Sequence, residues 1–254
     1  RGFGHGTHVA GLIALVAPAA RIIPVRVLDA EGIGNAWVLA EAMMYAIDPD
    51  GNPATDDGAH VINLSLGALA DTKIYKTVAK LVSCKARGLD KNGQPEDNDD
   101  GGAVTQSDKT RCGGLGGAVV VAAAGNLGTD KTREYPAAED GEGLIAVAAS
   151  DSSGWRADFS NYGWVKFAAP GDGLTSAIPG GGYATWSGTS MAAPLVAGTV
   201  ALLRAADRSL EIDKLVKRLQ DRGRKLCGTD LKQLDALAAI TDDKIDDKVK
   251  CAKR

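Results

Sequence analysis

Three segments of the chain carry residue types that could perform nucleophilic and acid–base chemistry. His5 lies between glycines in GHGTHVAG, at the start of an apolar stretch, so its ring would stay accessible, as a general base requires. Ser190 lies in SGTSMAAP and begins a second apolar stretch, which would place its hydroxyl near the free N–H groups of a helix start. Asn126 follows the apolar run AVVVAAAG, and its side-chain N–H could donate to a developing oxyanion.

Each of these residues also has an ordinary structural interpretation. A serine at a helix start commonly serves as an N-cap, and an asparagine after glycine is common in turns. His5 and His8 could form part of a zinc site, but the chain has no HExxH motif and no obvious third ligand. We therefore assign no metal-binding residue from the sequence.

The segments that must position these residues alternate between strand-like and helix-like patterns. Such alternation predicts a doubly wound α/β domain, with a mostly parallel sheet covered by helices on both faces, in three α/β/α layers. The expected strands are 22–28, 60–66, 118–124, 144–149 and, with a weaker pattern, 164–168. The expected helices are 7–16, 36–47, 74–82 and 190–206. Ligands bind at the carboxyl ends of the strands in such sheets, which is where Asn126 would lie.

Length and composition fit one large domain, or at most two small ones. The chain has 254 residues, 44% of them apolar, and a net charge of −3, which argues against a nucleic-acid-binding surface. No apolar run approaches the length of a membrane span. We expect one domain over 1–240, an inserted surface loop over 85–117 and a charged tail over 241–254. Within the charged, helical segment after 208, one apolar face is predicted from Leu231, Leu234, Leu237 and Ile240.

The four cysteines are Cys84, Cys112, Cys227 and Cys251. None forms a CxxC pair, which disfavours a zinc ribbon. Because they fall into two local pairs, each beside polar, loop-like sequence, we expect the disulfides Cys84–Cys112 and Cys227–Cys251. Disulfides would indicate an oxidising compartment; the alternative is four reduced thiols.

Taken together and in this order, GHGTHVAG, VVVAAAGN and WSGTSMAAPLVAG resemble the subtilisin-like serine peptidases, the subtilase family. The strand HVINLSLG, the Tyr135–Pro136 turn and the segment FAAPG also match. The resemblance covers roughly 4–67 and 117–207, and loosely 227–240. It stops between 68 and 117, where this chain is longer than typical members.

The resemblance implies a serine endopeptidase. His5 would be the general base, and Ser190 would attack the scissile carbonyl to form an acyl-enzyme. The side chain of Asn126 and the backbone N–H of Ser190 would form the oxyanion hole. No cofactor is implied for this chemistry.

The resemblance also implies where a substrate would bind. An extended peptide would pair along one wall of a pocket, formed by Ser65, Leu66 and Gly67, opposite a second wall formed by Ala123, Ala124 and Gly125. Glu134, which precedes Tyr-Pro, would lie at the base of this pocket. A carboxylate there would favour Lys or Arg just before the cleaved bond. The alternative is a surface glutamate beside Arg133.

The sequence departs from the family pattern at the third member of the catalytic triad. In the family this is an Asp in a strand well upstream of the histidine, and residues 1–4 cannot hold it. Asp29 lies downstream and has no motif around it. We therefore expect an upstream Asp-(Thr/Ser)-Gly segment, and without its strand we expect residues 1–254 alone to be poorly folded or inactive.

Further expectations follow from the resemblance. Many relatives insert a calcium-binding loop into the helix after the histidine, whereas 12–18 runs straight here, so a structural calcium would need another, unlocated site. The expected partner is a protein or peptide substrate in extended conformation, and a propeptide is usual in the family. The expected location is secreted or otherwise extracytoplasmic.

Two other functions are compatible with parts of this pattern. A catalytically dead relative could still bind peptides along 65–67, but the retention of His5, Asn126 and Ser190 together favours an enzyme. An α/β-hydrolase esterase requires GxSxG with the histidine after the serine. Here the histidine comes first and the serine motif differs, so we set this class aside.

Overall fold

The computed structural model describes residues 3–52, 55, 57–83, 117–139, 141, 143–208, 210–245 and 251. The expected inserted loop, apart from Gly117, and the pair Cys84 and Cys112 lie outside these residues. The described sheet has the strand order β1-β2-β3-β4-β8-β7. Its strands are β1 (Val61–Leu64), β2 (Val119–Ala123), β3 (Leu144–Ser150), β4 (Phe167–Pro170), β7 (Arg224–Lys225) and β8 (Lys232–Gln233). All neighbouring strands run parallel except β7, which pairs antiparallel to β8.

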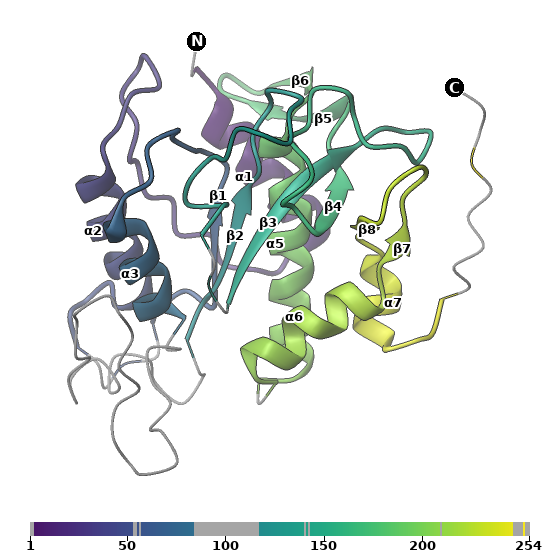
Figure 1. Cartoon of the computed structure of the whole chain (residues 1–254). Helices are drawn as coiled ribbons and strands as arrows, with labels where there is room; N and C mark the ends of the chain where they lie inside the picture. Colours follow the sequence, from purple (N-terminus) through teal and green to yellow (C-terminus); the bar gives the residue numbers. More distant parts are fainter. Residues whose placement is uncertain are drawn as a thin grey trace.

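Helices cover both faces of this sheet (Figure 1). One face carries α2 (Ala36–Ile47) and α3 (Lys73–Val82), and the other carries α5 (Thr189–Ala206), α6 (Ile212–Asp221) and α7 (Ala236–Thr241). Helix α1 (His5–Val16) packs alongside α5. A separate antiparallel hairpin joins β5 (Leu174–Ile178) to β6 (Gly182–Trp186). The structure thus confirms the predicted doubly wound α/β fold.

Strand β2 shows why the central run lacks polar residues. All five of its residues are buried. Val119 and Val121 pack in the apolar cluster that includes α5, while Val120 packs in the cluster formed with α2 and α3. A strand covered on both faces has no position for a polar side chain, so it reads as continuous Val and Ala.

The strand predicted over 22–28 is wrong. This segment is irregular, and Ile22 and Val25 are each 37% exposed. Its β-branched composition suits a strand, but a strand also needs a neighbour to complete its hydrogen bonds. Among the described residues β1 is the outermost strand on its side of the sheet, and nothing pairs with its outer edge. The segment therefore has a strand-like composition but forms no strand, because it pairs with no neighbouring strand.

The single helical face predicted for the C-terminal region is also wrong. The chain forms α6, then the short strands β7 and β8, then α7. Leu231 is buried beside Leu226 outside any helix, whereas Leu237 is 72% exposed. Gly228, at φ +66°, turns the chain between the two strands, and β8 pairs with β4. Sheet pairing thus overrides the leucine spacing here.

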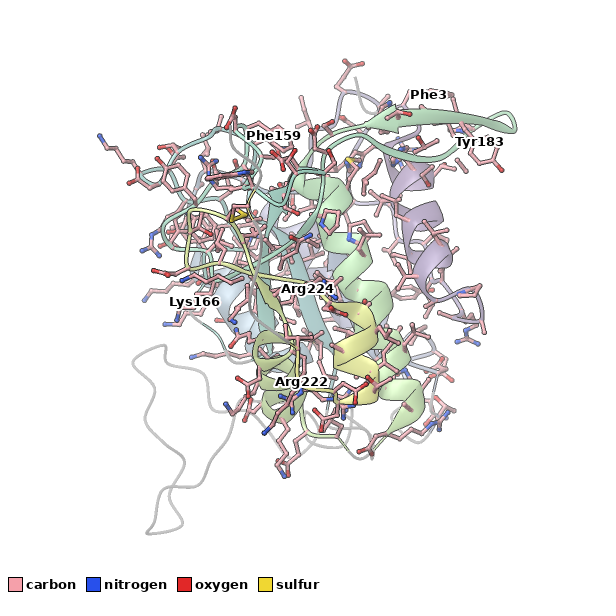
Figure 2. The ribbon with its side chains drawn as sticks, turned by 90° about the vertical axis from the view of Figure 1, so that its right-hand side faces the viewer. Phe3, Phe159, Lys166, Tyr183, Arg222 and Arg224 are labelled. Atoms are coloured by element: carbon pink, nitrogen blue, oxygen red, sulfur yellow. A yellow bond between two sulfur atoms is a disulfide. The ribbon has the colours of Figure 1, made fainter. Side chains whose placement is uncertain are left out.

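Smaller differences concern element ends and one missed motif. β4 begins at Phe167, so the strand predicted over 164–168 lies partly in a loop. The glycine run 180–182 marks the turn of the β5–β6 hairpin, whose strands the sequence analysis did not predict. Figure 2 shows this hairpin, with Tyr183 on it, near the beginning of α1 and the labelled Phe3.

Two further features bear on the setting of the protein. The structure contains the predicted Cys227–Cys251 disulfide, with an S–S distance of 2.07 Å and a Cα–Cα distance of 5.6 Å. Among the described helices, α5 alone is long and apolar enough to cross a membrane. It is mostly buried inside the protein, as core helices of soluble proteins also are.

Candidate active site

Ser190 is the second residue of α5, at the carboxyl end of strand β1. Its hydroxyl donates a hydrogen bond to the carbonyl oxygen of Ser65 at 3.2 Å. In return, the hydroxyl of Ser65 donates to the carbonyl oxygen of Ser190 at 2.7 Å. The beginning of α5 is therefore tied to the segment that follows β1.

Pro194 explains why this second hydrogen bond forms. It is the sixth residue of α5, so it lies in the second turn of the helix. A proline has no N–H to offer the carbonyl four residues earlier, which here is that of Ser190. The Ser65 hydroxyl supplies the missing donor.

Asn126 is oriented by the residue that precedes the serine. Its Oδ1 accepts hydrogen bonds from the backbone N–H of Thr189 at 2.8 Å and from the Thr189 hydroxyl at 3.1 Å. The buried Thr189 hydroxyl also accepts from the N–H of Gly125 at 3.0 Å. With Oδ1 engaged, Nδ2 is the donor that remains. A Cβ placed on Gly188 would lie 3.5 Å from that nitrogen, so the donor lies beside the loop that leads to Ser190.

Thr189, which orients Asn126, is not among the predicted site residues. The signal that could have revealed it is its place directly before the candidate nucleophile, because a residue bonded to Ser190 must also lie at the active site.

His5 is the first residue of α1 and follows Gly4, which is in the left-handed conformation at φ 80°. Its ring stacks with that of Trp186, with centroids 6.5 Å apart and planes 14° from parallel. Trp186 ends β6, four residues before Ser190. The helices α1 and α5 also share an apolar cluster that includes Val9, Leu12 and Met191. Both candidate groups thus lie at the beginnings of neighbouring helices.

The environment of His5 favours the neutral imidazole. Burial lowers the pKa of His5, and the positive charge that His8 can carry lowers it further. In the part of the chain that the structure describes, no carboxylate contributes to this shift and no hydrogen bond joins His5 to Ser190. A neutral imidazole can accept a proton, as a general base must.

His8 has a structural environment that does not fit a zinc pair. It is completely buried, stacks on Trp186 at 4.6 Å, and its Nε2 lies 3.0 Å from the carbonyl oxygen of Ala184. The ring therefore joins α1 to β6.

The two predicted pocket walls lie at the ends of adjacent parallel strands. Strands β1 and β2 are in register at Leu64 and Ala122, and the wall segments 65–67 and 123–125 follow directly. Beyond them, Ala68 and Tyr135 exchange two backbone hydrogen bonds, at 2.9 and 2.8 Å. This exchange brings the residue before Tyr135 against the walls.

Comparison with known proteins identifies this arrangement. The chain matches the Subtilase family over residues 2–227. It is 38% identical over 237 residues to the thermophilic serine proteinase of Bacillus sp. (strain AK1), covering 89% of this chain and 48% of that protein. It is 33% identical over 240 residues to Subtilisin Savinase of Lederbergia lenta, covering 91% of this chain and 74% of that protein. The chain belongs to the subtilase family.

Solved structures agree with this assignment. The crystal structure of a cold adapted subtilisin-like serine proteinase matches with a TM-score of 0.70 and 30% identity, covering 93% of this chain and 76% of that one. Proteases from Pseudoalteromonas arctica match with a TM-score of 0.73 and 28% identity, covering 94% of this chain and 70% of theirs. The chain spans about half the length of two relatives, 48% of the proteinase above and 51% of the thermostable alkaline protease of Halalkalibacterium halodurans.

In this subtilase, Asp29 does not stand in for the triad aspartate. Its Oδ1 accepts from the N–H groups of Glu31 and Ile33, both at 2.9 Å, within its own turn. Helix α1 runs without interruption from His5 to Val16, so the described chain has no loop inserted at that point.

The described residues that could hold a cation are Asp48, Asp50 and Asp57. Their ligand oxygens lie within 4.8 Å of one another. Carboxylate oxygens are ligands that calcium prefers, and Thr55 already donates to both oxygens of Asp50 at 3.1 Å. This cluster is not among the predicted site residues, although the spacing of acidic residues in DPDGNPATDD is a signal for it.

Proposed function

We propose that this chain is the catalytic part of a secreted serine endopeptidase that hydrolyses peptide bonds through an acyl-enzyme on Ser190. The observation that carries the proposal is the orientation of Asn126. Its carboxamide oxygen is held by Thr189, which leaves its N–H groups as donors beside the loop that carries Ser190.

The reaction would begin when His5 takes the proton of the Ser190 hydroxyl. The hydroxyl oxygen forms a bond to the carbonyl carbon of the substrate, and the resulting oxyanion accepts hydrogen bonds from Asn126 Nδ2 and the N–H of Ser190. Protonated His5 then gives its proton to the leaving amine, and water releases the acid in a second round. Since Ser190 donates to the Ser65 carbonyl, its hydroxyl must rotate toward His5 for the first step.

The substrate would be a protein or peptide segment in extended conformation. Gly67 is exposed, and its backbone makes no hydrogen bond to any other described residue. Its N–H and C=O can therefore pair with a substrate strand. The Cys227–Cys251 disulfide supports an extracytoplasmic location, because such bonds persist in oxidising compartments.

Hydrolysis of an internally quenched peptide library tests this proposal. We expect the full-length protein to cleave internal peptide bonds and Ser190→Ala to abolish cleavage while leaving the circular dichroism spectrum unchanged. A protein that binds the peptides at equilibrium without cleaving any would instead be the catalytically dead, peptide-binding relative.

A further inference from the structure

Glu134 lies between the two walls of the proposed substrate pocket, with one carboxylate oxygen toward each. A Cβ on Gly67 would lie 3.0 Å from Oε2, and a Cβ on Gly125 would overlap Oε1. Both wall positions are glycines: a Cβ on Gly125 would displace the carboxylate, whereas a Cβ on Gly67 would only make a tight contact with it. The half-buried carboxylate therefore lies between the two walls, whereas the neighbouring Arg133 is exposed.

Neutral donors hold the carboxylate in this position. Asn161 is completely buried, and its Nδ2 donates to Glu134 Oε1 at 3.3 Å and to the Ala124 carbonyl at 2.9 Å. Its Oδ1 accepts from the N–H of Leu127 at 3.0 Å, and from that of Thr129 at 3.4 Å. Asn161 thus ties Glu134 to the loop that carries Asn126. Nothing in the local sequence of Asn161 marks this role, so Asn161 is not among the predicted site residues.

The charge of Glu134 is not balanced by any cation of the described chain. No Lys or Arg among these residues forms an ion pair with it, and the neighbouring Arg133 is exposed. Burial raises the pKa of Glu134, although the hydrogen bonds from Asn161 and the N–H of Asn126 oppose this rise. A partly desolvated carboxylate with only neutral donors gains most from a cation that enters the pocket.

We infer that this pocket is selective for Lys or Arg as the residue directly before the cleaved bond, with Glu134 as the recognising group and Asn161 as its positioning residue. An ammonium or guanidinium group entering between the glycine walls meets Oε2, which faces Gly67. An apolar side chain would bury the carboxylate further without pairing it, which costs free energy. This inference rests on the proposed function, because it names the substrate class of the same site.

The test compares peptides that differ only in the residue before the cleaved bond, either Lys, Arg or Leu. We expect kcat/KM to favour Lys and Arg over Leu, and Glu134→Gln to reduce the Lys-to-Leu ratio by about 10- to 100-fold, as for loss of a charge-assisted hydrogen bond. Cleavage of the Leu peptide by the variant shows that it folds. Asp130→Asn, which removes an exposed carboxylate four residues earlier, should leave the ratio unchanged.

A second measurement does not depend on turnover. Binding of the cationic fluorescent probe p-aminobenzamidine should weaken by a similar factor in Glu134→Gln and not in Asp130→Asn. Equal cleavage after Leu and Lys, or a ratio and probe affinity untouched by Glu134→Gln, would overturn the inference while leaving the endopeptidase intact. A different result would be that the unaltered protein cleaves no peptide but binds the probe, and that Glu134→Gln no longer binds it. This result would overturn the proposed function and support a cation-binding pocket.

Discussion

The carboxamide of Asn126 is oriented by Thr189, so the catalytic contribution of the carboxamide and that of the orienting hydroxyl can be tested separately. We expect Asn126→Ala to lower kcat with little change in KM, because the donor matters most when the oxyanion forms. Removal of the corresponding donor in subtilisin itself lowers kcat by about 10²- to 10³-fold, and we expect a loss of that order here.

Thr189→Val is the variant to compare with Asn126→Ala, because it weakens the orientation of the carboxamide without removing it. It removes the hydroxyl that donates to Asn126 Oδ1 and keeps the backbone N–H that donates to the same oxygen. A smaller loss of kcat than in Asn126→Ala is expected. A full loss of activity in Thr189→Val with Asn126→Ala nearly unaffected would contradict the assigned roles.

His8 is expected to influence the pH dependence through His5. Burial first, and the charge of His8 second, lower the pKa of His5, so the neutral base is present at lower pH than for an ordinary histidine. Replacing His8 with Gln removes the second effect while keeping a donor for the Ala184 carbonyl. The rising acid limb of kcat/KM should therefore move to higher pH in His8→Gln.

The matched control is His60→Gln, which alters the remaining histidine of the chain. We expect it to leave the acid limb in place. An acid limb that stays fixed or moves to lower pH in His8→Gln would contradict the described electrostatics.

At the scale of elements, β1 and α5 are joined through the reciprocal hydrogen bonds of Ser65 and Ser190. Ser65→Ala leaves the Ser190 carbonyl without its donor, and we expect a loss of about 1–2 kcal/mol in the free energy of unfolding. In a Pro194→Ala background, the new N–H at position 194 can satisfy that carbonyl. Denaturant unfolding of the double-mutant cycle should then show a smaller cost of Ser65→Ala; an equal cost in both backgrounds would contradict the explanation.

The elements also show how far the sequence could predict this molecule. β2 was predictable because its lack of polar residues reflects burial on both faces. The segment 22–28 has equally suitable residues, yet it forms no strand, because a strand is defined by its neighbours. Sequence motifs located His5, Asn126 and Ser190, since their local surroundings carry the signal.

Other parts of the site depend on contacts between distant segments. Asn161 reaches Glu134 across 27 residues, and Trp186 stacks with His5 from strand β6, far along the chain. Nothing in the local sequence of Asn161 marks its role, and although Trp186 begins the segment WSGTSMAAPLVAG, that segment does not reveal its contact with His5. Their placement follows only from the order of strands and the position of the β5–β6 hairpin.

At the scale of the whole molecule, the outer edge of β1 and the partly exposed apolar segment 22–28 predict a weakly cooperative fold for residues 1–254 alone. Among the described residues no strand pairs with that edge, so its backbone groups lack a strand partner, and Ile22 and Val25, each 37% exposed, contribute less than fully buried side chains would. Differential scanning calorimetry of this segment should show no sharp transition at high temperature, whereas a protein that includes the expected upstream strand should show one. A sharp, cooperative high-temperature transition of residues 1–254 would contradict this prediction.

The central claim is that His5 activates the Ser190 hydroxyl and that Asn126 stabilises the negative charge that forms when this hydroxyl reacts. Labelling of the full-length protein with a fluorophosphonate, followed by peptide mapping, tests it most directly, because this reagent phosphonylates an activated serine and leaves an ordinary N-cap serine unmodified. The account predicts one adduct, on Ser190, that is lost in Ser190→Ala and slowed in His5→Ala and Asn126→Ala. An adduct on another residue, or none in a folded protein, would contradict it.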